Sequence, residues 1–147
     1  YPVILGEMPG PHLHVYPRYT VVAEKLEALT SLGMLNSRMK DYFDLWILAK
    51  HSDFDGQILS RAVAATFERR RTAVPTGVPI GLSDEFINDA QKGKQWQGFL
   101  RKNALDPMSL ATVVVDLRDF LMPVLAAIAA GGSHDYPWRA GAGWQKP

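Results

Sequence analysis

Residues 37–48 read SRMKDYFDLWIL, and this stretch decides the fold because large apolar side chains recur in it at helical spacing. Phe43, Trp46 and Ile47 gather on one side of such a helix, which must be buried against other elements. The same stretch carries an ordered set of charges, namely Arg38, Lys40, Asp41 and Asp44. We therefore expect a helix over residues 37–51 that holds these charges close to the core.

The segment before this helix has the same period. Its apolar side chains recur at steps of three and four residues, and they are Val22, Leu26, Leu29 and Leu32. This spacing predicts an amphipathic helix, with Thr20 as its N-cap and Gly33 at its end. A short turn would then join the two helices, and antiparallel packing would bring their inner faces together.

Further helices are expected toward the C-terminus. Asp55 is placed to cap a helix over residues 56–72, and Ser83, followed by two acidic residues, marks another helix start. Residues 83–103 are expected to form two short helices that divide near residues 92–94.

Ser109 is placed to cap a last long helix, which Pro123 should kink or end because proline lacks a backbone donor and clashes with the preceding turn. The sequence as a whole predicts a mainly α fold, a helical bundle of about five helices with a short N-terminal strand. We divide the chain into an extended connector with an edge strand (1–19), a helical domain (20–130) and a tryptophan-containing tail packed on the body (131–147).

The composition excludes several classes of protein. The 16 Lys and Arg residues against 15 Asp and Glu give a net charge of +1, so no overall basic field points to nucleic acid. Cysteine is absent, which excludes disulfides and thiolate chemistry and favours a reducing compartment. The longest apolar run, FLMPVLAAIAA (120–130), is interrupted by Pro123 and is far shorter than the roughly 20 residues of a membrane span. We therefore expect a cytoplasmic protein without a membrane partner.

The charges of the opening stretch have two interpretations. Arg38 lies three residues before Asp41, and Lys40 lies four residues before Asp44. Such pairs can form a solvated helix face, each worth only about 0.2–0.5 kcal/mol. Alternatively, Lys25 of the preceding helix converges with the two aspartates on one cleft. A lysine there could hold a phosphate, while an aspartate fixes that lysine, a ribose hydroxyl or a metal-bound water. Spacing alone does not separate these interpretations.

Two segments in this order resemble a known family. YPRYTVVAEKLEAL (16–29) followed by SLGMLNSRMKDYFDLWIL (31–48) is similar to the C-terminal signature of the abortive-infection nucleotidyltransferase toxins, the AbiEii/AbiGii family. These toxins resemble DNA polymerase β-like nucleotidyltransferases. In the family a tyrosine-proline step leads to an Ala-Glu-Lys helix and then to an Arg-x-Lys/Arg-Asp-x-x-Asp-Leu helix, and a tryptophan-bearing tail often closes the chain. The resemblance is strong over residues 1–51, weak through the middle and suggestive at residues 138–144.

The resemblance implies roles for individual residues. Lys25 matches the motif lysine, which is expected to contact nucleotide phosphates. Asp41 matches the aspartate that supports catalysis or nucleotide placement. The other matches are Arg38 and Lys40 as nucleotide-binding residues, and Asp44 and Glu24 as structural supports.

The resemblance also implies a reaction and its partners. It implies Mg²⁺ and a nucleoside triphosphate (NTP), transfer of a nucleotide to an acceptor such as tRNA, and an antitoxin partner. That chemistry rests on a Gly-Ser turn followed by an Asp-x-Asp pair that holds metal. GGSHD (131–135) lacks the second aspartate, and Asp53-x-Asp55 lies between helices, where capping is expected. We therefore expect a C-terminal helical part that is inactive alone, with its metal ligands elsewhere, and we assign no residue here to a metal.

Other motifs leave a second class of function open. The arginine run ERRRT (68–72) is expected to be solvated at a helix end, and the alternative is contact with an RNA backbone. Trp138 and Trp144 are expected to pin the tail to the core, and the alternative is stacking on a base. His12 and His14 form an i,i+2 pair without a third ligand at zinc-binding spacing. A non-catalytic helical module that recognises protein or RNA is therefore the alternative function.

The N-terminal segment predicts an assembly. Residues 3–5, Val-Ile-Leu, predict one short strand among prolines, and a single strand cannot form a sheet. Its apolar surface would stay uncovered without a catalytic part, and exposed apolar surface usually finds a partner. We therefore expect self-association through residues 1–19, which light scattering would test.

Overall fold

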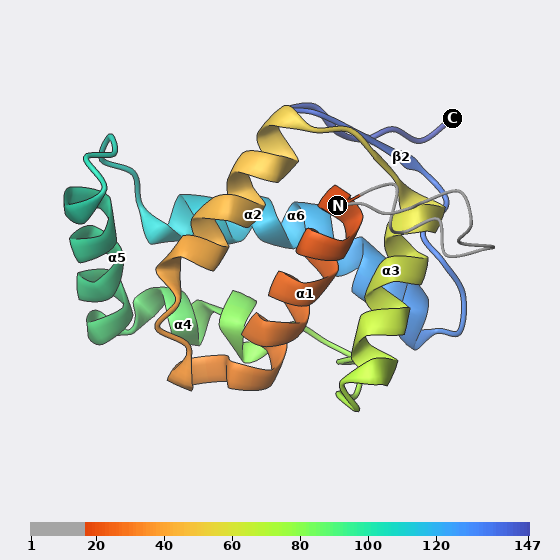
Figure 1. Cartoon of the computed structure of the whole chain (residues 1–147), viewed down its shortest axis with the longest axis horizontal. Helices are drawn as coiled ribbons and strands as arrows, with labels where there is room; N and C mark the ends of the chain where they lie inside the picture. Colours follow the sequence, from red (N-terminus) through yellow and green to blue (C-terminus); the bar gives the residue numbers. More distant parts are fainter. Residues whose placement is uncertain (1–16) are drawn as a thin grey trace.

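The computed structural model describes residues 17–147, in which α-helices dominate and a small antiparallel sheet lies at one end (Figure 1). The helices are α1 (Pro17–Leu32), α2 (Met39–His51), α3 (Gly56–Arg69), α4 (Asp84–Asn88), α5 (Ala90–Lys102) and α6 (Leu110–Ala129). The strands are β1 (Phe54–Asp55), β2 (Pro137–Arg139) and β3 (Gly143–Trp144), and two short 3₁₀ turns are η2 (Gly33–Leu35) and η3 (Ile80–Leu82). The predicted mainly α fold is confirmed. The expected N-terminal strand and most of the predicted self-association segment lie outside the described residues.

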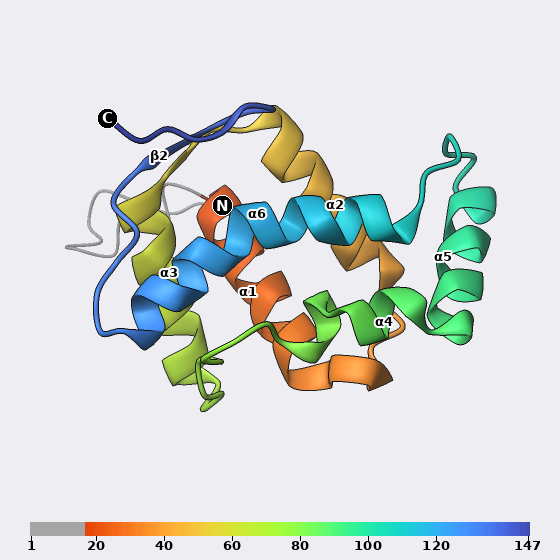
Figure 2. The same cartoon turned by 180° about the vertical axis from the view of Figure 1, so that it is seen from behind.

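The long helix α6 runs along the bundle and contacts α2 and α3 (Figure 2). Its buried side chains are Leu110, Val113, Val114, Leu117, Phe120, Leu121, Val124 and Leu125. Pro123 lies inside this helix, which continues to Ala129, so Pro123 does not end it. Apolar residues on both sides of Pro123 are buried, and we attribute the continued helix to this packing, which offsets the missing hydrogen bond. No helix within residues 17–147, α6 included, is long and apolar enough to cross a membrane.

The connection between α1 and α2 is a tight turn, as predicted. Gly33 ends α1 with φ +54°, a left-handed conformation that favours glycine. The start of α1 differs from the prediction, because the helix begins at Pro17 and Thr20 lies inside it. Proline is favoured in the first turn of a helix, where its missing N–H needs no partner. The last three residues of the expected connector therefore belong to α1.

Side-chain caps mark the start of three helices at the predicted positions. The capping residues are Asp55 for α3, Ser83 for α4 and Ser109 for α6. The predicted boundary near residues 92–94 is wrong. It lies at Asp89, whose carboxylate accepts a hydrogen bond from the backbone N–H of Lys92 at 3.0 Å, so that residues 92–94 fall inside α5. Helix α3 ends at Arg69 rather than Thr72.

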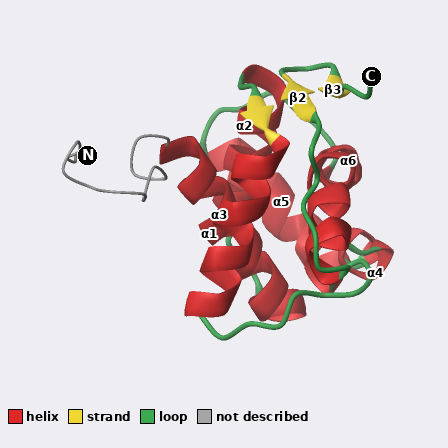
Figure 3. Ribbon diagram, turned by 90° about the vertical axis from the view of Figure 1, so that its right-hand side faces the viewer, coloured by secondary structure: helices red, strands yellow, loops and turns green. Residues whose placement is uncertain are grey.

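The C-terminal tail packs across one end of the helices (Figure 3). Strand β2 pairs with both β1 and β3, so the tail is tied to the α2–α3 connection by a sheet. The indole N–H of Trp138 donates to the carbonyl of Ala49 at 2.8 Å, and that of Trp144 donates to the carbonyl of Phe120 at 3.1 Å. Both tryptophans therefore hold the tail against the body through a satisfied polar end and a packed ring.

The first turn of α3 meets the tail at Gly56. The backbone N–H of Gly56 donates to the carbonyl of Tyr136 at 3.1 Å. A Cβ on Gly56 would lie 2.1 Å from the carbonyl oxygen of His134 and 2.4 Å from that of Tyr136. Only glycine permits this approach of two backbones.

We predict that Gly56→Ala destabilises the protein by about 2–3 kcal/mol, because the added methyl group overlaps backbone that cannot move independently. Urea unfolding would measure the loss. Gly77→Ala is the matched control, since a Cβ at Gly77 meets nothing within 4 Å. Equal stability of the two variants would contradict the close packing of α3 on the tail.

His134 predicts a pH dependence of stability. Burial, together with the charge of Lys146, lowers the pKa of the His134 imidazole, while Asp135 opposes this. Its Nε2 is buried without a hydrogen-bond partner in the described part of the chain. The unfolded chain therefore binds a proton more readily than the folded one, so the free energy of unfolding should fall as the pH drops below about 6.5.

Urea unfolding between about pH 7.5 and pH 5.5 would measure this fall. His134→Phe keeps a ring against Trp144 and should flatten the pH dependence. An unchanged slope in His134→Phe would contradict the assignment.

Candidate functional site

The carboxylate of Asp41 lies where α1 and α2 pack together. Nζ of Lys25, on α1, donates a hydrogen bond to Oδ1 of Asp41, on α2, at 2.8 Å. The same Nζ lies 3.4 Å from Oδ2 of Asp44, one turn further along α2. The structure therefore brings together the lysine and the two aspartates that the helical spacing suggested would converge.

Burial distinguishes this ion pair from a surface pair. The side chain of Asp41 is only 6% exposed, and that of Lys25 is 21% exposed. A carboxylate at this depth needs compensating cations, because its desolvation is costly. Nε of Arg38 is the second cation, 2.9 Å from Oδ2 of Asp41, in an ion-pair contact that lacks hydrogen-bond geometry. Asp41 therefore lies between two cations, Lys25 on α1 and Arg38 at the start of α2.

A buried polar network fixes the turn that carries Arg38. The side-chain oxygen of Asn36 accepts a hydrogen bond from the backbone N–H of Arg38 at 2.9 Å. The backbone carbonyl of Asn36 accepts one from Nζ of Lys92, a buried lysine on α5, at 2.7 Å. The hydroxyl of Tyr42 donates to the carbonyl of Gly81 at 2.8 Å, and burial raises the pKa of this phenol well above its usual value. The start of α2 is therefore held from three directions.

The positioning roles of Asn36 and Lys92 were not predicted from the sequence. The only sequence signal for them was that each is a polar residue within or beside an apolar helical pattern. Such a residue is usually solvated, so its burial depends on contacts between distant segments.

Lys40 and Asp44 form the exposed part of the charged stretch. Nζ of Lys40 donates to Oδ2 of Asp44 at 2.7 Å, and the Lys40 side chain is 75% exposed. The hydrogen bond and charge of Asp44 raise the pKa of Lys40. The solvated-face interpretation therefore describes this pair, whereas Asp41 belongs to the helix interface.

Glu24, next to Lys25 on α1, pairs with the end of α3. Its carboxylate forms ion pairs with Arg69 and with Arg70, the latter at 2.7 Å. Arg70 also lies 3.8 Å from Glu27, a buried carboxylate that accepts a hydrogen bond from the Thr72 hydroxyl at 2.6 Å. Two of the three arginines of ERRRT are thus neutralised by α1 rather than simply solvated. This pairing leaves little free charge there for an RNA backbone.

Two hollows flank the Lys25–Asp41 pair. The first, of about 310 Å³, is lined by Lys25, Arg38 and Arg70 and by two carboxylates, Glu24 and Glu27, both of which pair with Arg70. The second, of about 540 Å³, lies between the start of α2 and α5 and is lined by Arg38, Asp41 and Lys102 among others. Arg38 lines both hollows, and its side chain is 58% exposed. The paired charges are therefore accessible from solvent on the arginine side.

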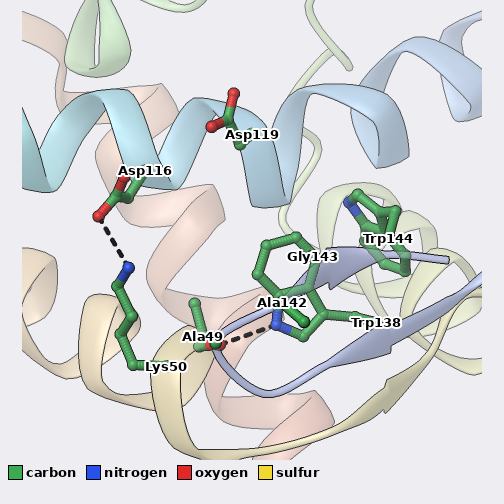
Figure 4. A pocket seen from close by; sticks show the side chains of 9 residues that line it. Ala49, Lys50, Asp116, Asp119, Trp138, Ala142, Gly143 and Trp144 are labelled. Atoms are coloured by element: carbon green, nitrogen blue, oxygen red, sulfur yellow. Dashed lines mark hydrogen bonds and ion pairs between the residues drawn. The ribbon is translucent and has the colours of Figure 1, made fainter.

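A third hollow, of about 330 Å³, lies between α2, α6 and the tail (Figure 4). Nζ of Lys50 is 3.2 Å from Oδ2 of Asp116 across it, and the indole of Trp46 donates to the same oxygen at 2.9 Å. Trp138 closes one side, but it is only 7% exposed and hydrogen-bonded through its indole. Its ring therefore cannot offer a free face to a base, which disfavours stacking on Trp138.

The described residues do not fit a magnesium site. No group of three His, Asp or Glu side chains gathers within residues 17–147. Asp41 and Asp44 are engaged by cations, which leaves them poor ligands for a further cation. Asp55 caps α3, and Asp53 accepts a hydrogen bond from the backbone N–H of Ala140 at 2.8 Å. Both aspartates of the one Asp-x-Asp motif therefore have structural roles.

Comparison with known families decides the class of the chain. The model of the family described as "Nucleotidyl transferase AbiEii toxin, Type IV TA system" matches residues 1–122. The chain belongs to the AbiEii toxin family. No curated protein and no solved structure matches it. The AbiEii match includes all of α1, α2 and α5, whereas the tryptophan tail lies beyond its end. Membership implies nucleotidyltransferase-type chemistry and a toxin whose system includes an antitoxin.

The ion pair predicts a coupled stability effect in this AbiEii chain. Lys25→Met should destabilise the fold by about 1–3 kcal/mol, because Asp41 loses its hydrogen-bonding cation while it remains buried. Asp41→Asn should cost a similar amount. The double variant should cost less than the sum of the two, which chemical denaturation in a double-mutant cycle would measure.

Lys40→Met is the control, since it removes an equal charge from an exposed pair and should change stability by no more than about 0.5 kcal/mol. Additive losses at Lys25 and Asp41 would contradict the direct coupling.

Proposed function

We propose that α1 and α2 form one wall of the nucleotide cleft of an AbiEii nucleotidyltransferase, in which Lys25 and Arg38 bind the triphosphate of an NTP. The observation that carries the proposal is the Lys25–Asp41 contact at 2.8 Å beside two hollows. The contact joins the two segments that resemble the family signature, and it holds Lys25 in place beside the hollows.

Both cations retain donors for a phosphate. A lysine ammonium has three N–H groups, and the contacts with Asp41 and Asp44 use at most two of them. The guanidinium of Arg38 approaches Asp41 through Nε, which leaves its two terminal nitrogens for bidentate contact with phosphate oxygens. A triphosphate can therefore bind without the loss of the ion pairs that hold the cations.

Asp41 acts in this proposal as a positioning residue. It is buried, and its carboxylate faces the two cations rather than open solvent. Its negative charge fixes where Lys25 and Arg38 present their free N–H groups. The energetic benefit is preorganisation, because fewer rotamers are lost when the nucleotide binds.

The reaction of the full-length protein would transfer the nucleotidyl group to a hydroxyl of an acceptor such as tRNA. The acceptor oxygen forms a bond to the α-phosphorus, the bond to the β-phosphate oxygen breaks, the hydroxyl loses its proton and pyrophosphate leaves. Mg²⁺ would neutralise the triphosphate, and its ligands would have to come from outside residues 17–147. The residues described above would bind and orient the triphosphate.

We predict that Lys25→Ala and Asp41→Ala each weaken binding of a fluorescent NTP analogue with magnesium to the full-length protein about tenfold or more, equivalent to about 1.4 kcal/mol. Fluorescence anisotropy would measure the dissociation constants. Circular dichroism and melting curves of each variant separate lost binding from lost folding.

Lys50→Ala is the matched control, because Lys50 lies at the other end of α2 and likewise pairs with an aspartate, Asp116 of α6. Its affinity should equal that of the wild type. Unchanged NTP binding in both Lys25→Ala and Asp41→Ala would overturn the cleft and favour the non-catalytic binding module.

A further inference from the structure

We propose that the outer face of α5, with the hollow between α5 and α2, binds the phosphate backbone of the acceptor RNA. Identifying the RNA as the acceptor rests on the proposed function, whereas the binding surface itself rests on the charge and shape of α5. Helix α5 lies at the opposite end of the molecule from α3, where the arginine run is located (Figure 1).

The first observation is unbalanced charge. Helix α5, AQKGKQWQGFLRK, carries four cationic and no acidic side chains. Lys92 is buried and bonded to Asn36, but Lys94, Arg101 and Lys102 are exposed. These three have no ion-pair partner among residues 17–147.

These cationic side chains lie on one continuous face of α5. One side of the helix carries two overlapping rows of residues at steps of three and four, namely 94, 98, 102 and 94, 97, 101. A hollow of about 480 Å³ is lined by Lys94, Gln97 and Arg101 with Gly93 and Ala90. The hollow shared with α2 continues the charge with Lys102, Arg38 and Lys40. The cationic side chains are therefore suited to follow a chain of phosphates.

The second observation concerns two glycines. Gly93 and Gly98 lie inside α5, where glycine costs stability relative to alanine. A Cβ at either position would meet nothing within 4 Å, and neither glycine has a positive φ. Internal packing and backbone conformation therefore do not explain them. Each lines one of the two hollows, so glycine there leaves the helix backbone open to a closely approaching ligand.

The remaining side chains of the face suit RNA better than an apolar partner. Gln95 and Gln97 offer amide donors and acceptors for sugar and base edges. Phe99 is half-buried and lines the hollow between α2 and α5. Its ring is fixed by Trp96 and Phe43, at centroid distances of 5.6 and 5.7 Å, and can present an edge or face to a base.

Binding of unfractionated tRNA to the full-length protein, measured by fluorescence anisotropy over a range of salt concentrations, tests the proposal. The double variant Lys94→Gln/Arg101→Gln should bind at least about tenfold more weakly near 0.1 M salt, and the slope of log affinity against log salt should fall by about 1.4–1.8. Arg61→Gln on α3 removes an exposed cation that likewise has no ion-pair partner in the described chain, and it should bind like the wild type.

Gly98→Leu gives a second test that unfolding cannot mimic. It should raise the melting temperature, because leucine is a better helix former and its Cβ meets nothing within 4 Å, yet it should weaken tRNA binding by blocking close approach. Stronger folding with unchanged tRNA affinity would overturn the role of the glycines.

The two proposals fail separately. The α5 variants should keep the wild-type affinity for the NTP analogue, and Lys25→Ala should keep tRNA affinity. Unchanged tRNA binding in the double variant, or an equal loss in Arg61→Gln, would overturn the α5 surface and leave the nucleotide cleft standing. The same variants can be tested for binding to vesicles that contain phosphatidylserine. If the double variant lost vesicle binding but kept tRNA binding, the α5 surface would be assigned to a membrane and the proposal would be overturned.

Discussion

The burial of one carboxylate between two helices constrains the rest of this site. Asp41 is nearly inaccessible to water, and a carboxylate in that position is tolerated only because Lys25 and Arg38 compensate it. The pairing ties the register of α1 to that of α2, since a shift of either helix by one residue would separate the charges. The same constraint aims two cations at the hollows beside them. In our proposal, stability and nucleotide binding therefore depend on the same three side chains.

The small net charge of the protein conceals a marked division of its charges. Carboxylates of α1 neutralise arginines at the end of α3, and Lys25 is shared between aspartates of α2. Helix α5 has no such acidic counterpart. Its Lys102, unpaired within residues 17–147, lines the hollow between α2 and α5, which Asp41 also lines. In our account this division places a triphosphate and a polyanionic acceptor next to each other, as a nucleotidyl transfer requires.

Local interactions account for what the sequence could predict. Helical periods and side-chain caps act over three to five residues, so the helices and the caps at Asp55, Ser83 and Ser109 were predictable. The approach of Lys25 to Asp41 followed from two such helices and a short turn. The boundary at Asp89 was misplaced because a lysine-rich stretch looked like a break, although Lys92 is buried inside α5. Pro123 does not end α6, which was one of the two outcomes expected for it, because buried packing on both sides outweighs its local cost.

Contacts between distant segments were not predictable in the same way. The bonds of Lys92 to Asn36 and of Tyr42 to Gly81 join residues more than 30 positions apart, and no periodic pattern encodes them. The pairing of β2 with β1 likewise depends on where the tail returns. The family resemblance implied roles for individual charged residues, but only the folded chain assigns Glu24 to α3 and Lys40 to an exposed pair.

The most direct measurement is a nuclear magnetic resonance titration of the full-length protein, isotopically labelled at lysine and arginine side chains, with a non-hydrolysable NTP analogue and magnesium. The account predicts that the side-chain nitrogen signals of Lys25 and Arg38 shift together and saturably, while that of Lys50 stays in place. Saturable shifts confined to Lys50 and the tail, with Lys25 and Arg38 unmoved, would contradict it.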